Sequence, residues 1–234
     1  MKRYSVASLI VEMQPEEKTL STQSKAYEIN TDQKADIVIK IPRSFLIQKQ
    51  EQNPHLTLDI CEYIFTGSVF YEKLLDYEGL ILHASAVVLD GNAYLFSARS
   101  GTGKSTHTSL WLRYFGDRAY IINDDKPALR IIDGKFMVCG TPWSGKTDQN
   151  INKIVPLRGI AFLERGQTNN IRRIDTREAL PLILEQTLRP TGRINELMSL
   201  LDKLLMDIPV YRLSCDMSKE AVECSYNAMK EMLD

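Results

Sequence analysis

The chain has 234 residues, of which 44% are hydrophobic and 25% charged, as in a soluble globular domain with or without a smaller annex. The formal net charge of −1 gives no reason to expect nucleic acid or an anionic membrane as the main partner. No apolar stretch approaches the roughly 20 residues that span a bilayer, and the apolar run at residues 7–11 is too short for a signal peptide. We therefore expect a cytoplasmic protein that binds neither nucleic acid nor a membrane.

The four cysteines are spread along the chain and form no C-x-x-C pair, and there are only three histidines. This spacing predicts neither a zinc site nor a disulfide framework. We expect free thiols at Cys61, Cys139, Cys215 and Cys224.

Residues 1–78 carry no recognisable catalytic signature. The apolar, β-branched residues 37–41, which a proline ends, predict a strand. The polar stretches at residues 15–18 and 48–54 predict loops or turns. Apolar residues at helical spacing predict a helix over residues 68–77. We expect a small β-rich N-terminal region that caps the rest or faces the substrate.

From residue 79 to residue 234, short apolar runs alternate with hairpin turns and helical patterns. Strands are predicted at residues 80–89, 93–96, 120–122, 129–132, 136–139, 160–163 and 210–213. Helices are predicted after Lys104, from residue 177 to about residue 205 with a break near 189–192, and over residues 218–233. Several strand pairs are joined by tight turns, which favours antiparallel neighbours. The expected fold is α/β with a mixed sheet.

Two segments have the composition of a loop that binds nucleotide phosphates. Such a loop needs small residues so that backbone N–H groups converge on the anion, a lysine for the β and γ phosphates, and a serine or threonine hydroxyl for Mg²⁺. The strict pattern G-x-x-x-x-G-K-[ST] occurs once, at residues 140–147 (GTPWSGKT). Residues 98–105 (ARSGTGKS) miss it because Ala98 stands at the first glycine position, a change that costs little if φ there is negative.

The surrounding sequence favours residues 98–105. They follow an apolar strand and precede a helix with an apolar face, whereas residues 140–147 lead into a polar stretch. In the second loop Pro142 removes an N–H donor and Trp143 is bulky. That loop is therefore the weaker candidate for a phosphate site, and the favoured alternatives are a turn that brings Lys146 and Trp143 to the cleft or a structural loop. We expect ATP to bind the first loop through Ser100, Gly101, Thr102, Gly103, Lys104, Ser105 and Thr106.

An acidic pair, Asp124-Asp125, follows a predicted strand about 20 residues after the lysine of the first loop. One strand-end carboxylate can complete the Mg²⁺ shell, and a second can take the proton of an attacking hydroxyl. The alternative is a plain turn, because Asn-Asp-Asp-Lys-Pro is rich in turn-forming residues. Basic candidates for stabilising a transition state, among which spacing does not choose, are Lys126, Arg158, Arg165, Arg189 and Arg193.

His83, residues 98–105, the acidic pair and residues 156–163 together resemble the kinase domain of HPr kinase/phosphorylase. The Ser-Gly-Thr-Gly-Lys core also resembles the phosphate loop of phosphoenolpyruvate carboxykinases, which share that fold. The chain is similar to small HPr-kinase-like proteins, some of them associated with modification of peptide precursors. The resemblance covers roughly residues 80 to 165. It implies a mixed-sheet P-loop kinase core of the HPr kinase/PEP carboxykinase type within a nucleotide-binding domain over residues 79–234.

The resemblance also implies a role for each site residue. Lys104 would bind the β and γ phosphates, while Ser105 and Asp124 would hold Mg²⁺. Asp125 would be the catalytic base that accepts the proton of a substrate serine, and His83 would assist or tune that base.

Two departures limit what the resemblance implies. Ala98 replaces the first loop glycine, and Pro156-Leu157 stands where the family has a Mg²⁺-binding glutamate. A second metal contact and the reverse, phosphorolytic reaction are therefore not carried over. Residues 1–78 do not match the HPr-kinase sensory domain, so no regulation by carbohydrate is inferred.

The leading hypothesis is an ATP- and Mg²⁺-dependent kinase that transfers the γ-phosphate to a hydroxyl, above all a serine of a protein or peptide. A small-molecule kinase on the same scaffold is the second hypothesis. The third is a nucleotide-binding regulatory protein without phosphotransfer, which the two departures leave open. A carboxykinase is disfavoured because those chains are much longer. The acceptor stays open, and the resemblance permits a homo-oligomer because HPr kinases assemble.

Overall fold

The computed structural model describes residues 1–230, which form two β-sheets with helices packed against them. The N-terminal sheet has the strand order β3-β1-β2-β4. Its central hairpin consists of β1 (Lys2–Val6) and β2 (Leu9–Met13). Ala7 and Ser8 form the turn, and both adopt the positive φ that a tight two-residue hairpin turn requires. The short strands β3 (Glu28–Ile29) and β4 (Ile37–Val38) lie at the edges.

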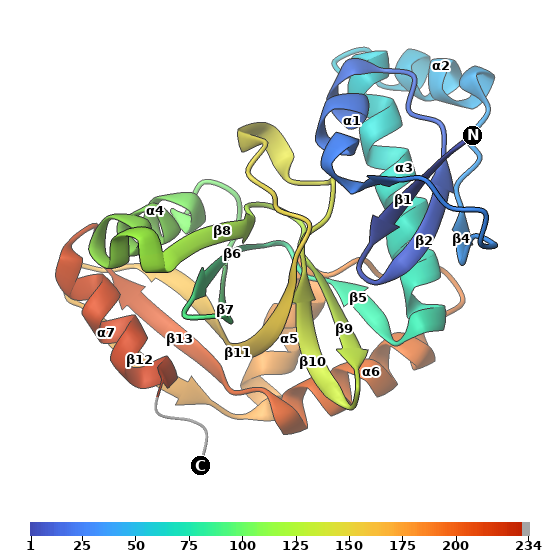
Figure 1. Ribbon diagram of the computed structural model, residues 1–234. Coiled ribbons are helices and arrows are strands. Elements are labelled where there is room, and N and C mark those ends of the chain that lie inside the picture. The colour runs from blue at the N-terminus through green and yellow to red at the C-terminus, as the bar shows by residue number, and fades with distance from the viewer. Residues whose placement is uncertain (231–234) are drawn as a thin grey trace.

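Three helices accompany this sheet: α1 (Lys18–Gln23), α2 (Arg43–Gln52) and α3 (Leu58–Leu74). Helix α3 packs along the sheet and leads into the second sheet (Figure 1). Its Phe70 and Leu74 lie in a hydrophobic cluster with Tyr4 and Val11 of the N-terminal sheet. The same cluster contains Trp143 from the second part of the chain. The N-terminal region therefore shares a core with the larger sheet.

The second sheet is mixed. Seven of its strands follow the order β5-β9-β10-β11-β7-β6-β8, and β13 pairs with β11 and with β12. Strand β11 runs parallel to β7 and to β13, and the other neighbours are antiparallel. The strands are β5 (Gly79–Ile81), β6 (Ala84–Leu89), β7 (Asn92–Ser97), β8 (Ala119–Asn123), β9 (Ala128–Ile132), β10 (Lys135–Cys139), β11 (Ile154–Arg165), β12 (Asn170–Ile174) and β13 (Val210–Cys215). The predicted α/β class with a mixed sheet is confirmed.

Helices cover both faces of this sheet (Figure 1). Helices α4 (Lys104–Phe115) and α7 (Lys219–Lys230) lie on one face, and α5 (Thr176–Gln186) and α6 (Ile194–Asp207) lie on the other. The central strands are consequently buried on both sides, which explains their continuous apolar sequences. In β6, Ala86 and Val88 pack toward α5 and α6, whereas Val87 and Leu89 pack toward α4 and α7.

The apolar run at residues 80–89 is two strands rather than one. Strand β5 pairs with β9, and β6 pairs with β7 and β8, so the chain crosses between two parts of the sheet at Leu82 and His83. The backbone N–H of His83 donates to the carbonyl oxygen of Gln186 at 2.7 Å. The crossing therefore places the backbone of His83 against the end of α5. The sequence does not indicate this bend, because the run is apolar on both sides of it.

The N-terminal region contains more helix than the sequence pattern predicts. The expected loop at residues 48–54 is wrong as far as Gln52, because Gln, Lys and Glu are strong helix formers and complete α2. The helix expected at residues 68–77 begins earlier, at Leu58, where the Thr57 hydroxyl accepts the backbone N–H of Ile60. The expectation of a β-rich region is wrong for the same reason, since the helices of this region are longer than its strands.

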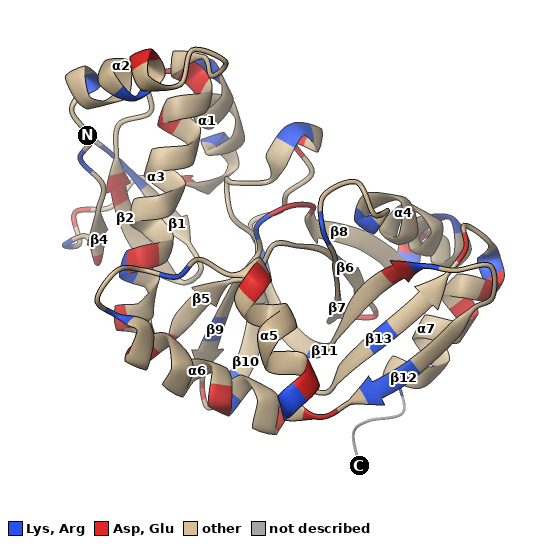
Figure 2. Cartoon of the chain, turned by 180° about the vertical axis from the view of Figure 1, so that it is seen from behind, with Lys and Arg blue, Asp and Glu red and all other residues tan. Residues whose placement is uncertain are grey.

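The C-terminal elements follow the predictions closely. Helices α5 and α6 lie on either side of the expected break, and β13 and α7 follow. The end of the helix predicted over residues 218–233 lies outside the described residues. Among residues 1–230, none of the helices is both long and apolar enough to cross a membrane. Basic and acidic residues alternate along much of the chain, as the coloured ribbon of Figure 2 shows.

His107 of α4 is a buried titratable residue. It lies beneath residues 98–105, which are called the phosphate loop below after their predicted role. It is 3% exposed, its ring packs edge-on against Phe96, and its Nε2 accepts a hydrogen bond from Trp111 Nε1 at 3.2 Å. Burial lowers the pKa of His107 from 6.5 to about 4, because the charged imidazolium would lose its hydration.

We predict that the free energy of unfolding falls by about 3 kcal/mol as the pH drops from about 6.5 to about 4. In that window His107 binds a proton in the unfolded chain but stays neutral in the folded chain, because its pKa is lower there. Acidification therefore favours unfolding. His107→Gln keeps an acceptor for Trp111 but does not titrate, so its stability should be flatter over this window. Urea denaturation at several pH values measures both slopes; identical slopes would contradict the prediction.

Candidate functional site

The loop between β7 and α4 has the backbone conformation that its glycines allow. Gly101 has φ +78° and Gly103 has φ +126°, and a Cβ atom at either would meet nothing within 4 Å. The glycines are thus required for chain direction and leave open space above the loop. Ala98 is not among the residues with positive φ in the described chain, so an alanine fits the first glycine position as expected. Helix α4 begins at Lys104 without a side-chain cap, which leaves backbone N–H groups of its first turn free for an anion.

Lys104 folds back over this loop. Its side chain is largely buried, and its Nζ donates to the carbonyl oxygen of Ala98 at 3.0 Å. Burial lowers the pKa of Lys104, while the negative charges of Asp125 and Asp124 oppose that shift. Both carboxylates therefore lie within electrostatic range of the loop lysine. Ser105, the next residue, is exposed on the first turn of α4.

Asp124 follows β8 directly and is buried. Its Oδ1 accepts the hydroxyl of Ser85 at 2.5 Å, and its Oδ2 accepts that of Thr147 at 3.0 Å. The Ser85 hydroxyl also lies 2.8 Å from that of Thr108 in α4. Two hydroxyls therefore connect the carboxylate of Asp124 to the helix that begins at the phosphate loop.

Asp125 forms a hydrogen-bonded ion pair. Its Oδ1 lies 3.1 Å from His83 Nε2, and its Oδ2 contacts the ammonium of Lys126. Burial alone would raise the pKa of Asp125, but the hydrogen bond to His83 and the charge of Lys126 outweigh it and hold the pKa at about 2. The carboxylate is therefore ionised at neutral pH, and Lys126 covers one of its oxygens.

The acidic pair also sits in a turn, as the alternative interpretation of the sequence held. Asn123 Oδ1 accepts the backbone N–H groups of Asp125 and Lys126 at 2.9 and 2.7 Å. Its Nδ2 donates to the carbonyl oxygen of Thr141 at 3.0 Å. The turn and the charged pair are thus the same structure, and the buried asparagine fixes the direction of the carboxylates.

Gln186, at the end of α5, is a site residue that the sequence analysis missed. Its Oε1 lies 3.0 Å from His83 Nδ1, so Gln186 and Asp125 contact opposite nitrogens of one ring. The side chain thereby sets the ring orientation. Ser85 and Thr147 were missed as well. Gln186 lies 103 residues from His83, and only the fold brings it to the ring.

The five basic candidates separate in the structure. Lys126 contacts Asp125, and Arg165 donates to the carbonyl oxygen of Gly101 at 2.6 Å. Arg158 instead bonds to Asn92, at the end of β7 opposite the phosphate loop. Arg193 pairs with Asp76 and Glu196, and Arg189 is exposed.

The second glycine loop, residues 140–147, has a structural role. A Cβ at Gly140 would lie 1.9 Å from the carbonyl oxygen of Ile151, so this glycine allows close chain packing. Trp143 is fully buried and stacks on Phe70 with ring centroids 4.8 Å apart. Lys146 is exposed. The loop then passes over the acidic pair, where a Cβ at Gly145 would lie 2.8 Å from that of Asp125.

A cavity of about 460 Å³ adjoins the phosphate loop. One wall consists of Gly101, Thr102, Gly103 and Thr106. The other walls contain the apolar side chains of Leu110, Leu163, Cys215 and Met217, together with Arg165 and Asp216. Its volume falls in the usual range for small-molecule sites.

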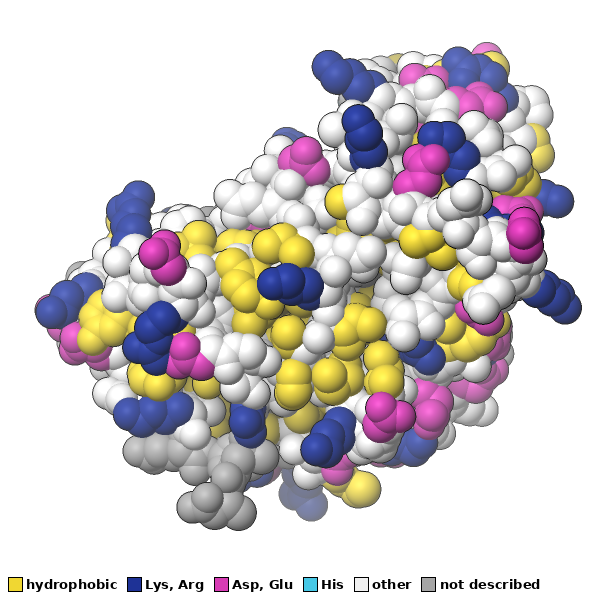
Figure 3. Space-filling model, viewed as in Figure 1, with side chains coloured by type: hydrophobic (Ala, Val, Ile, Leu, Met, Phe, Trp, Pro, Cys, Tyr) yellow, Lys and Arg dark blue, Asp and Glu magenta, His cyan; other side chains and the backbone are white. Residues whose placement is uncertain are grey.

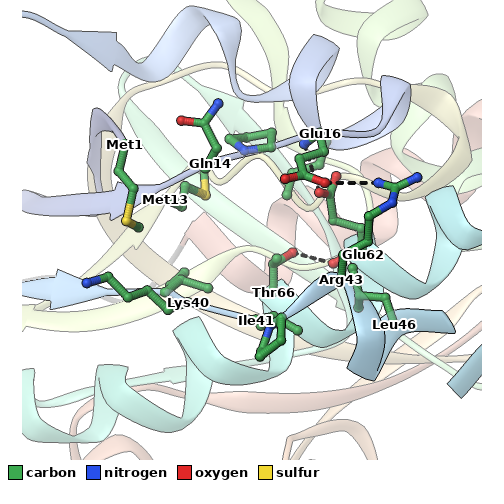
Figure 4. Close-up of a pocket in the computed structure, with 14 residues that line it drawn as sticks. Met1, Met13, Gln14, Glu16, Lys40, Ile41, Arg43, Leu46, Glu62 and Thr66 are labelled. Carbon is green, nitrogen blue, oxygen red and sulfur yellow. Dashed lines mark hydrogen bonds and ion pairs between the residues drawn. The ribbon is translucent and has the colours of Figure 1, made fainter. Parts of the chain in front are cut away.

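Another cavity, of about 300 Å³, lies in the N-terminal region. Figure 4 shows Met13, Ile41 and Leu46 along its walls and an ion pair between Glu16 and Arg43. None of the predicted site residues lines it. Apolar side chains also gather over the middle of the face seen in Figure 3, with charged side chains around them.

Two kinds of comparison with known proteins give matches. A search of solved structures finds the HPr(Ser) kinase/phosphatase from Coxiella burnetii, with a TM-score of 0.39 and 11% sequence identity over 65% of this chain and 97% of that chain. This is a distant likeness of fold. No curated protein matches the sequence. The model of the family described as SynChlorMet cassette protein ScmC matches residues 46–224, which is most of the chain. The chain therefore belongs to the SynChlorMet cassette protein ScmC family.

Proposed function

We propose that this chain is an ATP- and Mg²⁺-dependent kinase that transfers the γ-phosphate to a hydroxyl of a protein or peptide, most of all a serine. One observation carries the proposal: the Ser85 hydroxyl joins Asp124 to Thr108, one turn into the helix that begins at Lys104, so the loop lysine and the acidic pair belong to one site. A phosphate-binding element and two carboxylates in mutual range are the parts that phosphoryl transfer to a hydroxyl requires. The catalytic assignments made from the sequence are part of this proposal.

The donor side of the proposed site consists of oxygen and nitrogen groups suited to MgATP. The open N–H groups at the start of α4 and the ammonium of Lys104 would bind the phosphates. The Ser105 hydroxyl and the Asp124 carboxylate are hard oxygen ligands of the kind Mg²⁺ prefers. Residues 1–230 contain no cluster of three or more His, Cys, Asp or Glu side chains that could hold a metal. The two protein ligands Ser105 and Asp124 fit an ion that binds mainly through phosphates and water. When bound, the ion would neutralise charge on the transferring phosphoryl group.

The cavity beside the phosphate loop would hold the nucleoside. Its apolar side chains, Leu110, Leu163 and Met217, suit a flat base, and the loop residues on its other wall suit the attached phosphates. Arg165 contacts the loop and also lines the cavity, so it would lie close to both the phosphates and the nucleoside.

The acceptor side of the proposed site is the Asp125–His83 pair. The serine oxygen forms a bond to the γ-phosphorus, the bond from that phosphorus to the β–γ bridging oxygen breaks, and ADP leaves. The hydroxyl proton passes to Asp125, and the contact of that carboxylate with His83 would orient it and tune its basicity. Lys126 must release its carboxylate oxygen for this, and its ammonium is then free to face phosphate oxygens. Gln186 holds the ring in place throughout.

The ion pair between Lys126 and Asp125 also supports a second candidate function. A carboxylate with a pKa of about 2 is a weak base while the pair persists. If Lys126 never releases it, the chain binds nucleotide and acts as a regulatory protein without phosphotransfer.

The two glycine loops offer a matched pair of lysine variants. We predict that Lys104→Ala weakens MgATP binding by about 2–3 kcal/mol, on the order of 100-fold, because charge-assisted contacts to phosphate are lost. Lys146→Ala removes the exposed lysine of the literal motif and should leave the affinity unchanged. Isothermal titration calorimetry measures both. A larger loss in Lys146→Ala than in Lys104→Ala would move the phosphate site to the second loop.

For Asp125→Asn, we predict a fall in phosphotransfer of about 10²–10⁴-fold, because the amide cannot accept the proton. MgATP affinity should change little. The control is Asp133→Asn, an exposed turn residue with φ 51°, a conformation that asparagine tolerates. Transfer of ³²P from labelled ATP to serine peptides is the assay. Unchanged transfer in Asp125→Asn would show that another group is the base, and MgATP binding without transfer in the wild type would favour the regulatory alternative.

A further inference from the structure

A small pocket lies beside the acidic pair, between α3 and the large sheet. Its volume is about 100 Å³. Helix α3 supplies one side of it through Tyr63, Ile64, Gly67, Ser68 and Tyr71. The rest of the chain supplies the other side, through Ile81, Lys126, Trp143 and Leu188.

Three of these lining residues are close chain neighbours of the proposed acceptor site. Lys126 directly follows Asp125 and pairs with it. Ile81 lies two residues before His83, and Leu188 lies two residues after Gln186. Three separate segments thus lead from the proposed catalytic groups to one pocket, so its position does not depend on any single loop.

The lining favours an apolar occupant. The Tyr63 hydroxyl accepts the backbone N–H of Gly145 at 2.7 Å, and the Tyr71 hydroxyl donates to the carbonyl oxygen of Lys126 at 2.5 Å. The charge of Lys126 is paired with Asp125. Both tyrosine hydroxyls are thus engaged within the protein, and Ile64, Ile81, Trp143 and Leu188 make most of the rest of the lining apolar, so the pocket favours an aliphatic side chain.

The dimensions restrict that occupant to a single side chain. A dry engineered cavity of about 150 Å³ holds a benzene molecule, so about 100 Å³ suits an aliphatic side chain. At the pocket, Ile64 is 42% exposed and Leu188 is 36% exposed. An acceptor larger than one side chain can therefore lie across these two residues.

Resting on the proposed kinase function, we propose that the acceptor is a peptide with an aliphatic side chain within two residues of the phosphorylated serine, and that this side chain enters the pocket. An extended peptide advances about 3.3 Å per residue. The serine and its neighbour can thus reach Asp125 and the pocket beside Lys126 together. The pocket thus predicts which kind of side chain neighbours the serine in the acceptor peptide. The proposed kinase function alone does not predict this.

The test uses serine hexapeptides that carry Leu, Ala, Asp or Lys at one position within two residues of the serine. Transfer of ³²P from ATP gives kcat/KM, and tryptophan emission gives binding. Trp143 lines the pocket and the other tryptophan, Trp111, lies in a different core, so the emission change reports the pocket. The leucine peptide should be preferred over the alanine peptide on the order of tenfold at one position.

A matched pair of variants isolates the pocket. Ile64→Asp places a charge at the pocket, whereas Ile47→Asp changes an isoleucine of equal exposure, 42%, in α2. Ile64→Asp should abolish the leucine preference and favour lysine, with the KM for ATP unchanged, and Ile47→Asp should behave as the wild type. Equal transfer to all peptides would overturn the pocket assignment and leave the kinase standing. Leucine-dependent binding without transfer would support the pocket and overturn the kinase, and neither binding nor transfer would overturn both.

Discussion

The structure depends on the placement of two consecutive carboxylates at the end of β8, the strand at one edge of the large sheet. Burying one ionised carboxylate is costly, and burying two next to each other adds their repulsion. The chain divides the problem: hydroxyls from β6 and from residues 140–147 bind Asp124, while His83 and Lys126 bind Asp125. These partners come from three parts of the sequence, around residues 83–85, 126 and 147. Because each must reach the same point, the acidic pair fixes how the strand crossing, the phosphate-loop helix and the second glycine loop lie.

The second glycine loop connects the acidic pair to the N-terminal region. At one end Trp143 is embedded among aromatic side chains of α3, and at the other Thr147 contacts Asp124. Between them, Gln23 Nε2 donates to the carbonyl oxygen of Gly145 at 3.0 Å. The N-terminal region is thus in direct contact with the loop that covers the carboxylates. Its shared core gives this contact a rigid base, since aromatic clusters bury large areas.

The sequence predicted those features whose signals are local. The hairpin turns and the positions of most strands in residues 79–234 rest on neighbouring residues. Helix α2 was missed because most of its residues are polar and Leu46 is its one buried residue, so it has no apolar periodicity. Its polar residues are nevertheless good helix formers. Gln186 and Ser85 carry no local signal at all: a glutamine at a helix end and a serine in a buried strand become site residues only through contacts across the fold. The sequence indicated the acidic pair. It could not indicate the ion pair between Asp125 and Lys126, which depends on the geometry of the two side chains.

The last turn of α5 contacts both segments from which the proposed site is built. Glu185 forms an ion pair with Arg99 of the loop between β7 and α4, and the next residue, Gln186, contacts His83. Pro181 lies inside the same helix and removes a backbone hydrogen bond ahead of that turn. A substitution in this last turn would therefore alter contacts to both segments at once.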